Sequence, residues 1–160
     1  ITYDLDIPQD IAFEPLLELP PKALLAPDHP LSKHTSVALD QLAGEPLVLL
    51  DLPISREYFL SLFQAAGLEP LIAERTSQLP MVRSMVANGF GYGLMNVPDS
   101  SAHAPDGKPL RQVPIKGNHR LLKLGLVTMR SERKSRILAA FEEHCHRRIT
   151  SDTAQGLALL

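Results

Sequence analysis

The sequence contains a single cysteine, Cys145, and no tryptophan, and aromatic residues make up only 5% of its 160 residues. An internal disulfide is therefore impossible, which fits a protein of the reducing cytoplasm. The formal net charge of −2 gives the chain no overall positive charge with which to bind nucleic acid. No apolar run reaches the roughly 18 residues of a membrane-spanning helix. The N-terminus has neither a secretory signal nor an initiator methionine, so we expect a fragment of a longer protein.

Hydrophobic residues make up 44% of the chain, and their spacing alternates between strand-like and helical patterns. The continuous apolar run PLVLLD is typical of a strand covered on both faces. Helical spacing follows in SREYFLSLFQAAG, with Ser55 predicted to cap its start and Gly67 its end. The same alternation continues with a predicted strand in LIAER (71–75) and a second helix in SQLPMVRSMVANG (77–89), with Ser77 as its predicted N-cap. A third strand is predicted in YGLMNV (92–97). Strand–helix alternation over residues 46–97 predicts a parallel α/β sheet.

The flanking regions add shorter elements. KALLAP (22–27) is a short apolar run bounded by prolines and is predicted to be a buried strand. LDQLAG is predicted to be a short helix that ends at Gly44. Two strands are expected in LRQVPI and RLLKLGLVTMR (120–130), after an Asp-Gly loop. The last element is an amphipathic helix over residues 133–148. Its predicted inward side chains are Ile137, Leu138, Phe141 and Cys145.

Three alternating glycines, Gly89, Gly91 and Gly93, raise the question of a phosphate-binding loop. Such a loop needs a strand, then glycines, then a helix whose N-terminus meets the anion. Here the helix comes first and the strand follows. Gly89 is therefore predicted to close a helix in the left-handed conformation, and the other two glycines to allow a tight turn.

The segment MVRSMVANGFGYGLMNVP resembles a helix-to-strand stretch of the effector-binding domain in LysR-type transcriptional regulators. LLELPPKALLAPDHPL, VALDQLAGEPLVLLD and RLLKLGLVTMR resemble other parts of that domain, in the same order. The resemblance implies a periplasmic-binding-protein-like (type 2) α/β fold. In that fold two lobes are joined by two crossing strands, here KALLAP and LGLVT, and a small molecule binds in the cleft between them.

The resemblance also implies a domain division. Residues 1–27 and 123–150 would form a partial first lobe, residues 28–122 a complete second lobe, and residues 151–160 a tail. The helix-turn-helix that reads DNA in this family is absent. We therefore expect DNA contact only through an N-terminal domain missing from this chain.

Candidate effector-binding residues follow from the predicted parallel sheet. Ligands of open α/β sheets collect at the carboxyl ends of the strands, where helix N-termini present N–H groups and a partial positive charge. Arg56 could add a full charge for a carboxylate. The alternative is that Ser77 is only a helix cap, Arg56 a solvated side chain and Asn96 a turn residue. The predicted site comprises Pro53, Ser55, Arg56, Thr76, Ser77, Gln78, Asn96 and Pro98.

A metal site is not expected. His144, Cys145 and His146 are consecutive on a predicted helix, where they point about 100° apart and cannot meet at one ion. We predict a buried thiol between two surface histidines. No nucleophile–base constellation or nucleophile elbow indicates an enzyme, and no cofactor is implied.

An aromatic stripe on the helix at 55–66 predicts a homodimer or tetramer, because an excess of apolar side chains cannot all face inward. The resemblance places this helix and the strand LIAER against the first lobe of a partner subunit. The predicted interface comprises Tyr58, Phe59, Leu62, Phe63 and Ile72.

The leading hypothesis is a cytoplasmic regulatory domain that senses a small organic anion. Effector binding would shift the population of conformations and so alter DNA binding by the full-length protein. A transporter's solute-binding protein and an enzyme of the same architecture are the alternatives. A helix-turn-helix encoded upstream would favour the regulator, a signal peptide the transporter, and turnover by the full-length protein the enzyme.

Overall fold

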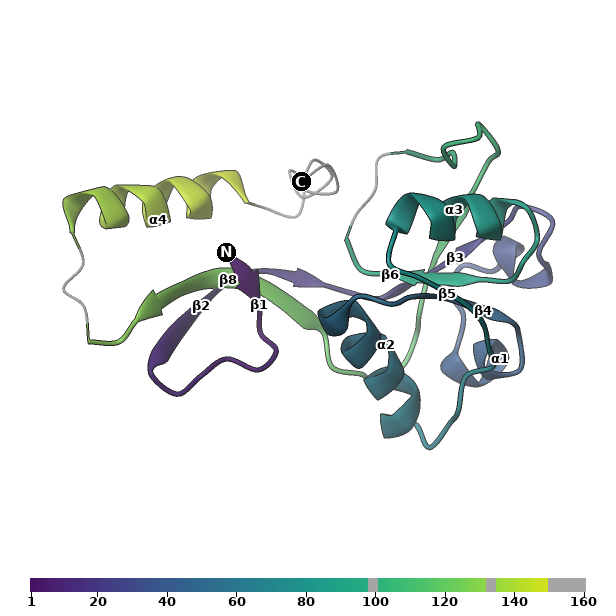
Figure 1. The fold of residues 1–160 in the computed structure, drawn as a ribbon, viewed down its shortest axis with the longest axis horizontal. Coiled ribbons are helices and arrows are strands. Elements are labelled where there is room, and N and C mark those ends of the chain that lie inside the picture. Colours follow the sequence, from purple (N-terminus) through teal and green to yellow (C-terminus); the bar gives the residue numbers. More distant parts are fainter. Residues whose placement is uncertain (98–100, 132–134, 150–160) are drawn as a thin grey trace. The chain divides into compact units, whose positions relative to one another are not determined.

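The computed structural model describes residues 1–97, 101–131 and 135–149. The chain forms two compact units (Figure 1). Unit 1 comprises Ile1–Leu19, Val97–Ser100 and Leu121–Leu160, and unit 2 comprises Pro20–Asn96 and Ser101–Arg120. These units divide the chain near residues 19 and 120, and the lobe boundaries expected after residues 27 and 122 stay a prediction. The strand at 22–25, expected to cross between lobes, pairs on both sides with strands of unit 2 and belongs to that unit.

Unit 1 contains an antiparallel sheet in the order β1-β8-β2, formed by Thr2–Tyr3, Leu122–Met129 and Ile11–Leu19. The register of β2 shifts between Pro15 and Leu17, which marks a β-bulge. Gly125 lies opposite this point, and a Cβ there would come within 2.5 Å of the Glu14 carbonyl oxygen. Only glycine allows the two backbones to approach so closely.

Helix α4 of unit 1 spans Arg136–Arg148 and begins where the Ser135 hydroxyl accepts a hydrogen bond from the Leu138 amide. Cys145 is buried and its two histidine neighbours are exposed, as predicted. The predicted inward face was partly wrong, because Ile137 is 84% exposed and Phe141 is 49% exposed. The buried positions are Glu142 and Cys145, with Leu138 half-buried. Spacing alone could not decide which of the adjacent Ile137 and Leu138 lies on the inner face.

Unit 2 is built on a mixed sheet. Strand β3 (Lys22–Leu25) pairs antiparallel with β6 (Gly93–Met95) and with β7 (Arg111–Pro114). Strand β4 (Leu47–Leu50) pairs parallel with β5 (Ile72–Thr76), and a parallel bridge between Leu47 and Tyr92 joins β4 to β6. The order is therefore β7-β3-β6-β4-β5. The parallel α/β arrangement predicted over residues 46–97 is confirmed.

The helices of unit 2 cover both faces of this sheet (Figure 1). Helix α3 (Leu79–Ala87) packs on one face, with Val82 and Val86 in a core cluster that includes Val48. Helices α1 (Leu39–Ala43) and α2 (Pro53–Ala65) lie on the other. A short 3-10 helix, η1 (Pro30–Lys33), follows β3. Apolar residues on both faces explain why β4 reads as a continuous hydrophobic run.

The predicted helix ends are right at the C-termini and wrong at the N-termini. Gly67 and Gly89 have φ of 69° and 81° and close α2 and α3 as left-handed residues. The N-caps, however, are Leu52 and Gln78, with no side-chain capping bond, rather than Ser55 and Ser77. A proline stands at the first or second position of each helix and sets where it begins.

The turn between α3 and β6 answers the question of the three glycines. Gly91 has a φ of 137°, and a Cβ there would lie 2.1 Å from the Pro46 carbonyl oxygen. That same oxygen accepts a hydrogen bond from the Tyr92 amide at 2.8 Å. The glycines thus let β6 approach β4 closely, and they follow a helix rather than precede one.

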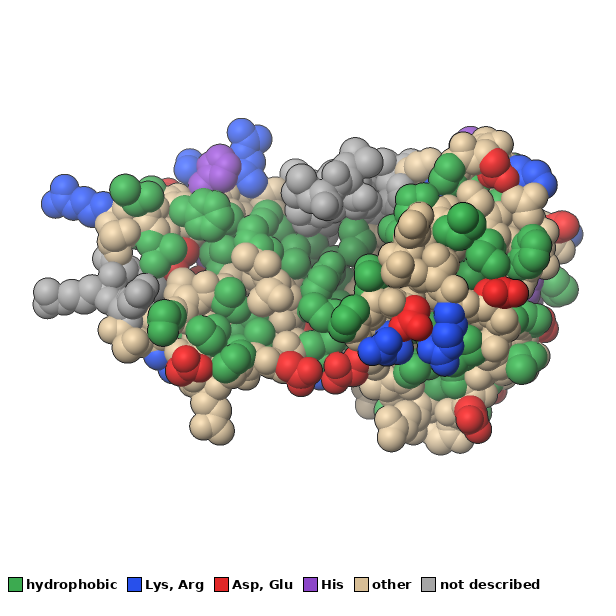
Figure 2. All heavy atoms as spheres, viewed as in Figure 1, with side chains coloured by type: hydrophobic (Ala, Val, Ile, Leu, Met, Phe, Trp, Pro, Cys, Tyr) green, Lys and Arg blue, Asp and Glu red, His purple; other side chains and the backbone are tan. Residues whose placement is uncertain are grey.

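The surface in Figure 2 shows acidic and basic side chains interspersed among hydrophobic ones, with no continuous patch of one sign on this face. None of the helices in the described part of the chain combines the length and the hydropathy that a membrane crossing requires.

Candidate functional site

Three parallel strands of unit 2 end at the same edge of the sheet. Through the Leu47–Tyr92 bridge, the order β6-β4-β5 places Asn96, Asp51 and Thr76 at the carboxyl ends of neighbouring strands. The Asp51 amide donates to the Thr76 carbonyl oxygen at 2.8 Å, which fixes the two strand ends together. Helices α2 and α3 both begin at this edge. We call it the carboxyl edge of unit 2.

The structure brings most of the predicted site residues to this edge. Pro53, Ser55 and Arg56 lie in the first turn of α2, and Ser77 and Gln78 immediately precede α3. Asn96 follows β6 and is half-buried. Pro98 lies outside the described residues.

The helix N-termini offer fewer free N–H groups than the sequence analysis assumed. Pro53 and Pro80 have no N–H, and the Met81 amide already donates to the Gln78 carbonyl oxygen at 3.0 Å. The Gln78 amide donates to Thr76 Oγ1 at 3.2 Å. An anion at this edge would therefore depend more on side-chain cations than on backbone amides.

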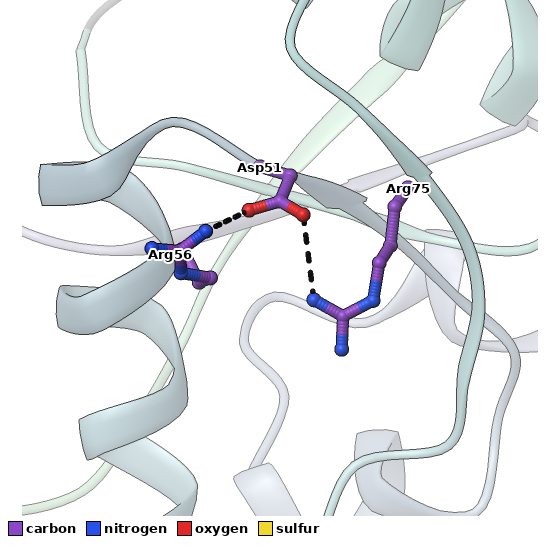
Figure 3. Close-up of polar contacts among 3 residues, drawn as sticks. All are labelled: Asp51, Arg56 and Arg75. Atoms are coloured by element: carbon purple, nitrogen blue, oxygen red, sulfur yellow. Dashed lines mark hydrogen bonds and ion pairs between the residues drawn. The ribbon is translucent and has the colours of Figure 1, made fainter.

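Two arginines share one carboxylate here (Figure 3). Arg56 Nη1 on α2 lies 2.6 Å from Asp51 Oδ1, and Arg75 Nη1 on β5 lies 3.5 Å from Asp51 Oδ2. The hydrogen bond from Arg56, with a smaller contribution from Arg75, holds the pKa of the Asp51 carboxyl below its ordinary value. Arg56 is therefore neither a free ligand nor a merely solvated side chain.

Asp51 and Arg75 were missed by the sequence analysis. The sequence does indicate their position, since Asp51 directly follows the apolar run of β4 and Arg75 is the penultimate residue of β5. Charged residues at the ends of adjacent parallel strands meet at one edge, so the expected register could have placed them together.

Exposed apolar side chains flank these polar groups. Leu52 caps α2, Ile54 lies in its first turn, and Met81 lies in the first turn of α3; all three are exposed. The carboxyl edge thus combines cations with apolar surface, a combination suited to a small molecule with an anionic group and an apolar body.

The predicted interface residues are mostly unavailable to a partner. Tyr58, Phe59, Leu62 and Phe63 are each at most 2% exposed and pack inside unit 2. The premise that the stripe was too apolar to face inward was wrong, because all four side chains are buried within unit 2. Ile72 alone remains half-buried and lines a hollow of about 570 Å³ with residues of α2 and the following loop. The hollow is also lined by Leu60, Gln64, Gly67, Leu68, Glu69 and Pro70.

Comparison with known proteins gives consistent matches. Residues 1–150 match the family model of the LysR substrate binding domain. The crystal structure of HinK, a LysR family transcriptional regulator from Pseudomonas aeruginosa, is 32% identical with a TM-score of 0.82 and covers 92% of this chain. The HTH-type transcriptional regulator MetR of Salmonella typhimurium is 28% identical over 96 residues, or 59% of this chain.

A more distant structure shares the fold. The BenM effector-binding domain with its effector benzoate is 19% identical with a TM-score of 0.74, over 88% of this chain and 64% of that one. This chain spans 52% of the length of HinK and 30% of that of MetR. Because the family model matches nearly the whole chain and the related structures share its fold, the chain belongs to the LysR substrate-binding domain family.

Proposed function

We propose that this chain is the sensing domain of a LysR-type transcriptional regulator and that it binds a small organic anion at the carboxyl edge of unit 2. The observation that carries the proposal is the pair of guanidiniums from α2 and β5, which share a single carboxylate beside two helix N-termini. Two positive charges against one negative charge favour an additional anion. DNA would be bound by a part of the full-length protein outside this chain.

The chemistry of the edge supports an amphipathic carboxylate. Arginine binds carboxylates through paired N–H groups, and the exposed Leu52, Ile54 and Met81 offer contact to an apolar body. Benzoate, the effector of BenM, is a molecule of this kind. Thr76, Ser77, Gln78 and Asn96 would orient the ligand by hydrogen bonds.

The alternative functions have less support. The family model and the curated relatives are those of transcriptional regulators, which does not favour a transporter's solute-binding protein. No observation on the described residues favours an enzyme. We propose that effector binding acts by shifting the population of conformations in the full-length regulator, in the cytoplasm where its DNA target lies.

Calorimetry with small carboxylic acids and their matched primary amides tests the proposal. An acid that binds should stabilise the chain by about 2.7 kcal/mol at 100 times its dissociation constant, and its amide should bind far more weakly. Substituting Arg56→Ala together with Ser77→Ala should abolish measurable binding. It should lower folding stability by at most about 1 kcal/mol, because the fold loses one partly exposed ion pair and no helix cap. Arg111→Gln, an exposed arginine on β7, is the matched control. Unchanged affinity in the double variant would place the ligand elsewhere.

We also propose a homo-oligomer, with the hollow beside Ile72 in place of the aromatic stripe as the contacting surface. Its apolar lining from Leu60, Leu68 and Pro70 supports this. Light scattering on the intact protein should show a dimer or tetramer, and a strict monomer at micromolar concentration would count against it.

A further inference from the structure

We propose that Asp51 is an internal counter-anion: its carboxylate occupies the arginines that an effector anion needs, and it sets how tightly an anion must bind to replace it. The inference rests on the proposed function and names a regulatory residue of that same site. Asp51 would then act against binding, whereas the arginines act for it.

The geometry of the contacts carries the argument. Each Asp51 oxygen accepts from a different arginine through a single nitrogen, Nη1 of Arg56 at 2.6 Å and Nη1 of Arg75 at 3.5 Å (Figure 3). A guanidinium has five N–H donors in a planar fork. Within the described residues, neither arginine has another acidic partner. Both therefore keep donors for a second carboxylate, and Arg75 is the less firmly held of the two.

Exposure makes the exchange feasible. The Arg56 and Arg75 side chains are about half exposed, at 46% and 49%, and the Asp51 side chain is 25% exposed. Ion pairs in such positions are weak because water and salt screen them. An incoming carboxylate that makes additional contacts can therefore take the place of the Asp51 carboxylate on the arginines, while the Asp51 side chain rotates away.

A backbone hydrogen bond keeps Asp51 close to the two arginines, where its carboxylate competes with an incoming anion. Its amide is bound to the Thr76 carbonyl oxygen, so the carboxylate cannot move away with the strand end. Glu57 on α2 and Glu74 on β5 are neighbours in sequence, but the structure gives neither an ion pair with Arg56 or Arg75 among the described residues. Asp51 is thus the acid that neutralises this pair.

Inorganic sulfate is a suitable probe because it carries charge without an apolar body. The Nε–H resonances of the arginines can be followed by NMR while sulfate replaces chloride at constant ionic strength and pH 7. We expect Asp51→Asn to bind sulfate about tenfold more tightly than the unaltered chain. Adding Arg75→Gln to Asp51→Asn should remove that gain, and Asp51→Glu, which keeps the charge, should behave like the unaltered chain.

The matched control is Asp106→Asn. Asp106 is another aspartate of unit 2 with a lowered pKa, caused first by a hydrogen bond from Asn88. It is exposed and lies in the loop after β6. Its substitution removes the same charge and should leave sulfate binding unchanged. Equal gains in the two Asn variants would reduce the effect to net charge and overturn the proposal, as would no gain in Asp51→Asn.

The two proposals fail separately. If no organic acid binds but Asp51→Asn gains sulfate affinity through Arg75, the counter-anion stands and the effector assignment fails. If acids bind at this edge but Asp51→Asn binds sulfate and acids no more tightly, the effector assignment stands and Asp51 is only a structural partner of Arg56. Asp51→Ser also removes the carboxylate and should gain sulfate affinity in the same way, which gives a second readout should Asp51→Asn fail to fold.

Discussion

Two tyrosine hydroxyls lie inside unit 2 in different surroundings. Tyr58 Oη donates to the Arg120 carbonyl oxygen at 3.0 Å. Tyr92 Oη is buried with no hydrogen-bond partner among the described residues. Burial, with a smaller effect from the charge of Glu45, raises the pKa of Tyr92. A buried hydroxyl without a partner costs stability, whereas a bonded one contributes to it.

Replacing each tyrosine by phenylalanine separates these effects, because only the hydroxyl is lost. Tyr58→Phe should lower the free energy of unfolding by about 0.5–1.5 kcal/mol. Tyr92→Phe should leave it unchanged or raise it by up to about 1 kcal/mol. Urea unfolding at pH 7 measures both. A loss in Tyr92→Phe as large as that in Tyr58→Phe would mean that the Tyr92 hydroxyl has a partner, such as a bound water.

Single residues were the hardest feature to predict from the sequence. Arg56 could be chosen because an arginine in a first helical turn stands out beside a strand end. Its partner Asp51 is five residues earlier, and Arg75 is 19 residues later on another strand. Their meeting depends on the register of β4 and β5, which the sequence does not state. The buried aromatic stripe of α2 was misjudged for a related reason, since the room available to it depends on how α2 lies on the sheet.

At the scale of elements, periodicity and glycines carried most of the prediction. The left-handed Gly67 and Gly89 end α2 and α3 as expected, because few other residues adopt positive φ without strain. Ser55 and Ser77 were poor guides to helix starts, since Pro53 and Pro80 decide where α2 and α3 begin. Strand β2 was not predicted at all. Its Pro15 lies at a bulge and interrupts the pattern that would have marked a strand.

Helix α3 also anchors the loop at 101–110 through one buried side chain. Arg83 is only 6% exposed, and its Nη2 donates to the carbonyl oxygens of Ser101 at 2.9 Å and His103 at 2.7 Å. Burial lowers the pKa of this guanidinium. Hydrogen bonds from a charged donor are stronger than neutral ones, so this contact is a main attachment of the loop to α3.

Arg83→Met keeps the apolar stem but removes these bonds. We expect it to lower the free energy of unfolding by about 2–4 kcal/mol, since two carbonyl groups lose a charged donor. The Leu110 amide, bonded to the Ala102 carbonyl oxygen, should exchange with deuterium much faster than in the unaltered chain. Exchange at Val48 in β4 should change only in line with global stability. Equal acceleration at both amides would show that Arg83 supports the whole unit rather than the loop.

At the scale of the whole chain, the order of elements was more predictable than the pairing of the strands. Residues 46–97 form the predicted strand–helix succession because their apolar spacing changes with each element. KALLAP was expected to cross between lobes, and the structure pairs β3 on both sides, with β6 and β7, within unit 2. Such partners are distant in sequence, and a short apolar run carries no information about which strands flank it.

The stability of the whole chain should depend on pH, and one histidine is expected to contribute to this dependence. His119 lies in unit 2, lines a hollow of about 370 Å³ with Leu62 and Leu68, and has a buried Nδ1 without a partner in the described part of the chain. Burial lowers the pKa of His119 from its ordinary 6.5. Below pH 6.5 the unfolded chain therefore binds a proton that the folded chain resists, and stability falls as the pH falls.

We expect the free energy of unfolding to decline as the pH falls from about 7 towards 5, and the decline to be smaller in His119→Asn. The exposed His34 gives the control variant His34→Asn, which should keep the full decline. A second decline should begin below the ordinary aspartate pKa of 3.8, because the pKa values of Asp51 and Asp106 are lowered in the fold. Above pH 3.8 the ionised carboxylates stabilise the folded chain, and this stability is lost as the pH falls and they are protonated. Urea titrations from pH 8 to pH 3 measure both, and an unchanged upper decline in His119→Asn would show that another group causes it.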